Sequence, residues 1–199
     1  MYNDHYVITV SRQFASLGRT IAEHAAKKLG IYYLDRDLIE HAAKRLDISV
    51  DEVKKGEEKS TNSLIRRKFP FGLTPSPLED EIFQVESSIM HDVAKEQSCI
   101  IVGRLGEHVL RNHPRHLHVY IYAPKEARLK NAVEVLGMDK RLAEKTLRDV
   151  DLSRAYYRRR YTMCTQSFEE RELMIDSSVF SVDQAAELIV QAAKIKFEL

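Results

Sequence analysis

The sequence predicts an α/β fold in which two layers of helices cover the faces of a parallel β-sheet. Short apolar runs, of the length found in buried parallel strands, occur at residues 6–10, 32–34, 99–102, 117–122 and 173–175. Segments with helical periodicity lie between these runs, and this alternation is typical of a three-layer α/β protein. With 199 residues and 44% apolar content, the chain is long enough for one core, and we expect a single domain spanning residues 1–199.

The helical segments have recognisable ends. The first helix presents an apolar face that consists of Ile21, Ala22, Ala25, Ala26 and Leu29. Gly30 follows this helix at the place of a C-terminal cap. Apolar residues at helical spacing continue through residues 79–96, and Pro124 suits the first position of a helix that runs to about Leu136. The last helix begins with a capping box formed by Ser181 and Gln184.

Two segments interrupt this alternation. Residues 54–77 are rich in charge, Ser, Pro and Gly around a small apolar cluster, which suggests a flap. Residues 139–160 form a basic helical segment, in which Arg154 and Arg158 share a face with Asp151. The arginines of this segment are Arg148, Arg154, Arg158, Arg159 and Arg160. The run at residues 158–160, taken by itself, is better explained as a solvated charged face.

Composition excludes several classes of protein. The net charge of +1 gives no bulk attraction to nucleic acid, so any anion site must be local. The longest apolar runs, such as residues 99–103, are far shorter than the roughly 20 residues that cross a bilayer. The first ten residues lack the basic region and cleavage site of a signal peptide, so we expect a cytoplasmic protein. Cys99 and Cys164 are far apart and are interpreted as free thiols.

Residues 7–30, VITVSRQFASLGRTIAEHAAKKLG, read as a strand, a loop and a helix. The loop partly matches the phosphate-binding pattern G-x-x-x-x-G-K-[ST], with Gln13 at the first Gly and Arg19 at the Lys. A helix N-terminus attracts anions even without the full pattern, although an ordinary strand-to-helix connection is the alternative. Thr20 is a candidate either for Mg²⁺ binding or for capping the helix. The predicted phosphate ligands are Gln13, Ser16, Leu17, Gly18, Arg19 and Thr20.

Polar residues also follow the second and third strands. Asp35, Arg36 and Asp37 come after residues 32–34, and Gly103 and Arg104 come after residues 99–102. Open α/β sheets bind ligands at the carboxyl ends of their strands, so these side chains are expected near the phosphate loop. Taken singly, Asp37 could cap a helix and Arg104 could be a surface cation. Together they supply the cations, hydroxyl and carboxylates that phosphoryl transfer requires.

These motifs resemble the cytidylate kinase-like proteins of bacteria, which are relatives of the nucleoside monophosphate kinases. The resemblance rests on ITVSRQFASLGRTIAEHAAKKLG, YYLDRDLIEHAAK, CIIVGRLGEHVL, RDVDLSRAYYRRRY and MIDSSVFSVDQAAELI, in that order. It implies a P-loop kinase fold with strand order 2-3-1-4-5, ATP and Mg²⁺ at the first loop, and a helical lid. The lid would be the arginine-rich segment at residues 139–165, and the flap at residues 54–77 would lie on the acceptor side.

The resemblance also implies roles for individual residues. The phosphate loop would comprise Ser16, Gly18, Arg19 and Thr20, the monophosphate pocket Asp35 and Arg36, the acceptor-phosphate site Gly103 and Arg104, and the lid Asp151 and Arg154. Two features depart from the family pattern. Val102 and Leu105 flank the Gly-Arg pair where cytidylate kinases carry acidic residues, so Asp35 or Asp37 would have to compensate. No CMP-binding insert is recognisable in residues 54–77.

The sequence therefore predicts an ATP-dependent phosphotransferase of the nucleoside monophosphate kinase type, with a small phosphorylated acceptor such as CMP. The catalytic candidates are Arg19, Asp35, Asp37, Arg148, Asp151, Arg154 and Arg158. The substrate-binding candidates are Arg36, Gly103 and Arg104, and Thr20 is the metal candidate. The alternative is a nucleotide-binding or regulatory protein that has the fold without transfer activity. A nucleic-acid binder is disfavoured because no aromatic stacking platform accompanies the arginines, and the oligomeric state is left open.

Overall fold

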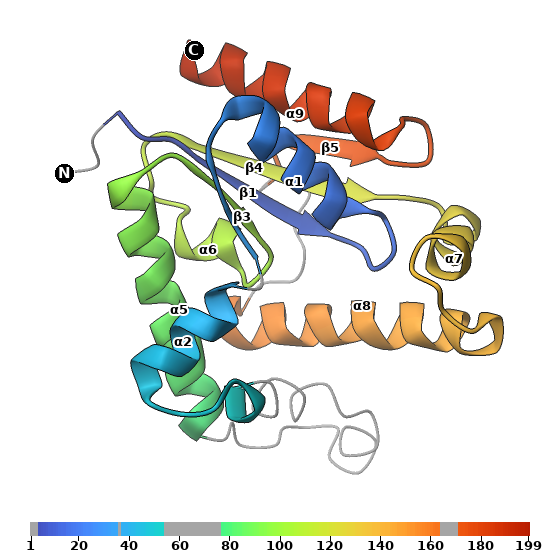
Figure 1. Ribbon diagram of the computed structural model, residues 1–199, viewed down its shortest axis with the longest axis horizontal. Coiled ribbons are helices and arrows are strands. Elements are labelled where there is room, and N and C mark those ends of the chain that lie inside the picture. The colour runs from blue at the N-terminus through green and yellow to red at the C-terminus, as the bar shows by residue number, and fades with distance from the viewer. Residues whose placement is uncertain (1–3, 36, 54–76, 164–170) are drawn as a thin grey trace.

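The fold consists of one five-stranded, all-parallel sheet with helices on both faces (Figure 1). A computed structural model describes residues 4–35, 37–53, 77–163 and 171–199. The strands are β1 (Val7–Arg12), β2 (Tyr32–Leu34), β3 (Cys99–Val102), β4 (His116–Tyr122) and β5 (Leu173–Asp176). Their order is β2-β3-β1-β4-β5, which confirms both the predicted fold class and the predicted strand order.

Seven helices surround this sheet in the described part of the chain. They are α1 (Gly18–Leu29), α2 (Asp37–Leu46), α5 (Pro77–Glu96), α6 (Gly106–Val109), α7 (Lys125–Glu134), α8 (Lys140–Thr162) and α9 (Val182–Phe197). In Figure 1, α1 and α9 lie together against one face, whereas α2, α5 and α6 lie on the side of the other face. Helix α8 runs across the carboxyl ends of the central strands.

The two faces of the sheet bury different cores because successive strand residues point to opposite sides. On β1, Ile8 and Val10 join the larger cluster with α1 and α9, whereas Val7 joins a second cluster with α2 and α5. The same second face becomes polar toward β4. There, Ser11 Oγ lies 2.8 Å from Nε2 of the buried His118. This hydrogen bond fixes Ser11 at the carboxyl end of β1, where it faces a cavity.

Element boundaries agree with the sequence prediction to within two residues. The capping box of Ser181 and Gln184 is present, and Gly30 caps α1 with a φ of 65°. Strand β1, however, continues beyond residue 10 to Arg12, because its pairing with β4 extends that far. Pro124 is the cap residue before α7 and not its first helical residue.

Some expectations concern residues outside the described ranges. Residues 54–76 of the predicted flap and Arg36 lie outside them, while Pro77 is the first residue of α5. Cys99 is a buried free cysteine, and burial raises the pKa of its thiol to about 12, whereas Cys164 is not described. None of the helices that the structure describes has both the length and the apolar character needed to cross a bilayer.

Candidate active site

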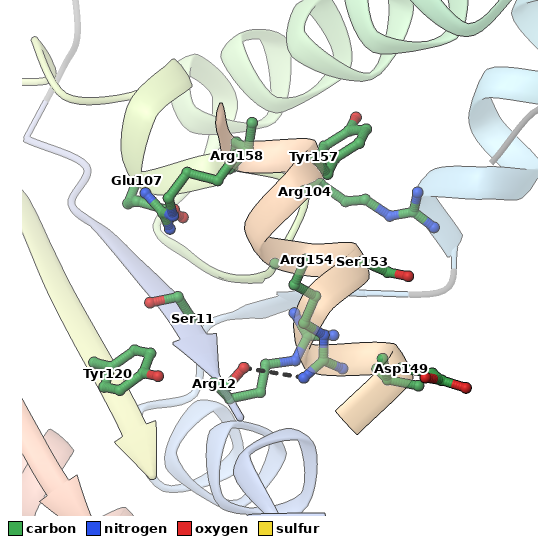
Figure 2. A pocket seen from close by; sticks show the side chains of 13 residues that line it. Ser11, Arg12, Arg104, Glu107, Tyr120, Asp149, Ser153, Arg154, Tyr157 and Arg158 are labelled. Atoms are coloured by element: carbon green, nitrogen blue, oxygen red, sulfur yellow. Dashed lines mark hydrogen bonds and ion pairs between the residues drawn. The ribbon is translucent and has the colours of Figure 1, made fainter. Parts of the chain in front are cut away.

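A cavity of about 470 Å³ opens at the carboxyl ends of the central strands (Figure 2). Its lining comes from the end of β1, the turn after β3, the start of α6, strand β4 and one side of α8. Its polar lining includes Ser11, Arg12, Arg104, Tyr120, Tyr157 and Arg154. The predicted Gly103, Arg104, Arg154 and Arg158 all lie in this lining, so the tertiary structure brings these four candidates together.

The loop after β1 is tied to β4 by its own polar side chains. The Gln13 side chain accepts a hydrogen bond from the N–H of Ala123 at 3.1 Å. The Ser16 hydroxyl lies 2.9 Å from the carbonyl oxygen of Gln13 and 3.2 Å from that of Ile121. Ala15 and Leu17 adopt left-handed conformations, with φ of 58° and 57°. Gln13 and Ser16 therefore shape the loop, and any phosphate contact falls to backbone N–H groups and to the residues that follow.

The loop leads into the first turn of α1, which begins at Gly18. The N–H groups of Gly18, Arg19 and Thr20 have no acceptor within the helix, because the first turn lacks a preceding turn. With the helix dipole, they form a site for anions. Leu17, at the cap position, offers no side-chain cap. Thr20 is exposed on this turn, where its hydroxyl is accessible to a ligand.

Arg19, in the first turn of α1, forms an ion pair with Asp35, which follows β2. The sequence analysis expected the polar residues after this strand to lie near the phosphate loop. The Nε of Arg19 lies 2.5 Å from Oδ2 of Asp35, and the Arg19 side chain is 44% exposed. Arg19 thus reaches toward the end of β2, in contact with one of the two predicted carboxylates. Asp37, the other predicted carboxylate, is an exposed residue at the start of α2.

Helix α8 holds the phosphate loop through Asp151 and Arg154. Oδ1 of Asp151 accepts a hydrogen bond from the N–H of Phe14 at 2.8 Å. Oδ2 of Asp151 lies 2.5 Å from the guanidinium of Arg128, which the sequence analysis did not single out. Arg154 donates to the carbonyl oxygen of Arg12 at 3.0 Å (Figure 2). The predicted Asp and Arg of the lid therefore contact the phosphate loop directly.

The interpretation of residues 158–160 as a solvated face is wrong for two of the three arginines. Arg158 pairs with Glu107 on α6, and both side chains are buried or nearly so, at 13% and 5% exposure. Arg160 pairs with Glu79 and Asp80 on α5. Only Arg159 of the run is exposed. Successive residues of a helix project at about 100° to one another. Arg158 therefore faces α6, Arg160 faces α5, and Arg159 faces solvent.

Arg148 is not brought into the site. Its side chain is 70% exposed, its Nε lies 3.9 Å from Oδ1 of Asp149, and it is not among the described residues that line the cavity. The sequence analysis placed Arg148 with Asp151 and Arg154 because all three lie on one helix. The orientation of α8 against the sheet places the side that carries Ser153, Arg154 and Tyr157 toward the cavity instead.

Arg12 is the most important residue that the sequence analysis missed. It is the last residue of β1, it lines the cavity, and its guanidinium lies beside that of Arg154 (Figure 2). Burial and the nearby Arg154 lower the pKa of Arg12 to about 9. The sequence offered one signal for it: Arg12 is a charged residue that follows the apolar run at residues 6–10 and comes one position before the loop pattern begins.

A buried carboxyl group lies behind Arg104. The Glu86 side chain on α5 is 0% exposed, and Nη1 of Arg104 lies 3.4 Å from its Oε1. Neither oxygen of Glu86 has a hydrogen-bond partner in the described structure. Burial outweighs the nearby cation and raises the pKa of Glu86 to about 8. A carboxyl group with this pKa is mainly protonated at pH 7, so Glu86 offsets little of the positive charge of Arg104. The carboxyl groups near Gly103 come from α5 and α6, and the sequence analysis had looked for them at Asp35 and Asp37.

The raised pKa of Glu86 predicts how stability depends on pH. Between the ordinary pKa of 4.5 and the folded value of about 8, the unfolded state releases a proton that the folded state retains. The free energy of unfolding should therefore fall as pH rises through this window. In the Glu86→Gln variant, this part of the decline should be absent, so the variant should gain stability relative to the parent as pH increases from 5 to 8. Urea unfolding at several pH values measures this difference. Parallel curves for the two proteins would contradict the prediction.

Comparisons with known proteins concern the family and the fold. The model of the cytidylate kinase-like family matches residues 7–179. The crystal structure of an uncharacterized protein from Eubacterium ventriosum ATCC 27560 aligns with a TM-score of 0.72 and 20% identity, over 96% of this chain and 99% of that one. No curated protein matches the chain.

Two shikimate kinases share the fold at lower similarity. The enzyme from Bacteroides thetaiotaomicron aligns with a TM-score of 0.55 and 12% identity, over 98% of this chain and 99% of that one. The enzyme from Acinetobacter baumannii, in complex with shikimate, aligns with a TM-score of 0.51 and 17% identity, over 94% and 92%. At these identities the likeness concerns the fold alone, which is that of the P-loop kinases.

Proposed function

The chain belongs to the cytidylate kinase-like family, and from this we propose that it is an ATP-dependent phosphotransferase. It would transfer the γ-phosphoryl group of ATP to a small phosphorylated acceptor, with CMP as the first candidate. The observation that carries the proposal is the position of the arginine-lined cavity. It adjoins the phosphate loop at Arg12, so a ligand in the cavity and a nucleotide on the loop would lie side by side.

The nucleotide phosphates would bind at the start of α1. The N–H groups of Gly18, Arg19 and Thr20 and the positive end of the helix dipole would hold them. Arg19 can exchange its pairing with Asp35 for phosphate oxygens, because its own side chain is 44% exposed and a phosphate offers the guanidinium more negative charge than one carboxylate does. This exchange would place the guanidinium over the β- and γ-phosphates, where the P-loop pattern places a lysine.

Mg²⁺ fits the residues at this loop. In kinases, Mg²⁺ keeps several waters and takes phosphate oxygens with only one or two protein ligands. The exposed Thr20 hydroxyl can supply one such ligand. No cluster of three or more His, Cys, Asp or Glu residues suited to a metal occurs in the described ranges. When bound, the ion would neutralise charge on the phosphates.

Transfer would depend on positioning and on charge stabilisation. Arg104, with Arg36 as the second predicted acceptor ligand, would orient the acceptor. Arg154 lies between the cavity and the phosphate loop, where it can stabilise the oxygens of the transferring phosphoryl group. Asp151 and Arg128 would support it by keeping α8 on the loop. The bond between the γ-phosphorus and the oxygen of ADP would break, an unprotonated phosphate oxygen of the acceptor would bond to that phosphorus, and ADP would leave with the bridging oxygen. An acceptor that still carries its second phosphate proton would release it to solvent.

The proposal is tested by measuring ATP consumption with Mg²⁺ and a panel of acceptors, together with thermal unfolding. The panel comprises nucleoside monophosphates, shikimate-like acids and dephospho-coenzyme A. We expect turnover that requires one acceptor class, with ATP and that acceptor each raising the melting temperature by mass action. Stabilisation by ATP without turnover on any acceptor would instead favour the nucleotide-binding or regulatory alternative. Absence of any ATP effect would contradict both.

A further inference from the structure

The Arg12 side chain occupies space that is open only because residues 18 and 103 are glycines. A Cβ atom added at Gly18 would lie 2.8 Å from Cβ and 3.2 Å from Cγ of Arg12. A Cβ atom added at Gly103 would lie 1.9 Å from Nη1 of Arg12. Such distances are below van der Waals contact, so neither position accepts a side chain while Arg12 stays in place. The stem of Arg12 therefore rests on the start of α1, and its guanidinium rests on the turn after β3.

This arrangement places the Arg12 guanidinium at the boundary between loop and cavity. Arg12 lines the cavity, whereas none of residues 13–20 does so. Figure 2 shows its guanidinium next to that of Arg154. Burial and the charge of Arg154 lower the pKa of Arg12, Arg19 and Arg104 add to this effect, and Asp35 acts in the opposite direction. No carboxylate forms an ion pair with Arg12 in the part of the chain that the structure describes. Repulsion between neighbouring guanidinium groups decreases when an anion binds beside them, so an anion stabilises the charged form of Arg12.

The charges of the cavity lining show which anion would be suitable. Four arginines line the cavity, Arg12, Arg104, Arg154 and Arg158, against two carboxylates, Glu107 and Asp149, which leaves an excess of two positive charges. The Glu107 charge is already paired with Arg158. A phosphate monoester carries a charge of about −1.5 to −2 at pH 7, whereas a carboxylate carries only −1. The lining therefore matches a phosphate monoester better than a carboxylic acid.

We propose that Arg12 binds the phosphate group of the acceptor and thereby selects phosphate monoesters. This inference rests on the proposed function, because only a transfer reaction has an acceptor. It adds a ligand-binding residue that lies outside the loop pattern. The planar guanidinium can give two parallel N–H groups to one phosphate, a geometry that lysine lacks. Gly18 and Gly103 take part indirectly, because each of them gives the Arg12 side chain its position.

The test is isothermal titration calorimetry of the full chain with inorganic phosphate, in the presence of Mg²⁺ and excess ADP to occupy the loop. Arg12→Gln should weaken phosphate binding by about 10- to 100-fold, as expected for lost hydrogen bonds to a charged group. Arg12→Lys, which keeps the charge without the fork, should weaken it by about 10-fold. Arg159→Gln, which alters an exposed arginine of α8, is the matched control and should bind like the parent. Acetate should bind more weakly than phosphate to the parent.

A second variant moves the Arg12 guanidinium without removing its charge. Gly103→Ala keeps Arg12 but displaces its guanidinium, and it should also weaken phosphate binding. Thermal unfolding checks that each variant is folded. Phosphate binding that is absent in the parent, or that persists within about threefold in both Arg12→Gln and Gly103→Ala, would overturn the proposal. Titration with Mg·ADP alone tests the nucleotide site. Failure of that titration with Arg12-dependent phosphate binding intact would therefore reject the kinase proposal but not this one.

Discussion

Replacing Arg154 by alanine is expected to lower acceptor-dependent turnover of ATP by about 10³-fold, the largest effect that we expect from one side chain. Arg154 projects from α8 into the cavity and donates to the carbonyl oxygen of Arg12 at 3.0 Å. A guanidinium at this boundary stabilises negative charge that develops on the transferring phosphoryl group. Because that charge is greatest in the transition state, the loss should fall mainly on kcat.

The measurement is steady-state turnover with the acceptor found in the panel, compared across three α8 variants. Arg154→Lys should recover part of the activity, since it restores the charge without the planar fork. Arg159→Ala should match the parent, because Arg159 points to solvent on the same helix. The hydrogen bond to Arg12 also gives Arg154 a structural role, so thermal unfolding of each variant must accompany the kinetics. An Arg154→Ala protein that is folded and retains more than about a tenth of the parent turnover would remove Arg154 from the mechanism.

Replacing Arg19 by alanine should reduce turnover by about 10²-fold or more without unfolding the protein. The Arg19 side chain is 44% exposed and that of Asp35 is 9% exposed, so losing the pair should lower the melting temperature somewhat, and thermal unfolding must accompany the kinetics. Its expected role is electrostatic contact with the nucleotide phosphates, so weaker binding of ATP should accompany the lower turnover.

A cation elsewhere on α1 provides the control for Arg19. Lys27 is 69% exposed and pairs with Glu23 one turn away, so Lys27→Ala removes a positive charge from the same helix without touching the loop. Nucleotide affinity and turnover of this variant should match the parent. Unaltered turnover in Arg19→Ala would mean that Arg19 stays paired with Asp35 in the parent protein. Backbone groups and other arginines would then bind the phosphates.

The fold could be predicted because its signals are local. Apolar runs of strand length alternate with helical periodicity, and caps such as Gly30 and the Ser181–Gln184 box lie within a few residues of the ends they mark. The phosphate loop is recognisable for the same reason, since strand, loop and helix start follow one another directly. The strand order was implied by resemblance to a family. It depends on which strands pair across the sheet, and no local pattern encodes that.

The site could be predicted only where its residues follow the ends of strands. Gly103, Arg104 and Asp35 meet at one edge because the carboxyl ends of parallel strands do so. The orientation of α8 was not predictable in this way, and Arg148 was therefore wrongly grouped with Arg154. Glu86 was read as part of an amphipathic helix, because nothing in its neighbourhood along the chain indicates that it is buried behind Arg104.

The sequence by itself determined that this chain is an α/β protein with an anion-binding loop after its first strand. The tertiary structure decided which charged side chains line the cavity and which form ion pairs elsewhere. Arg154 contacts the backbone of Arg12 across 142 residues, and Arg158 meets Glu107 across 51. Helix periodicity places two arginines on the same helix face, but it does not say what covers that face. Burial and pairing depend on neighbours that are distant along the chain, so they exist only once the helices have packed against the sheet.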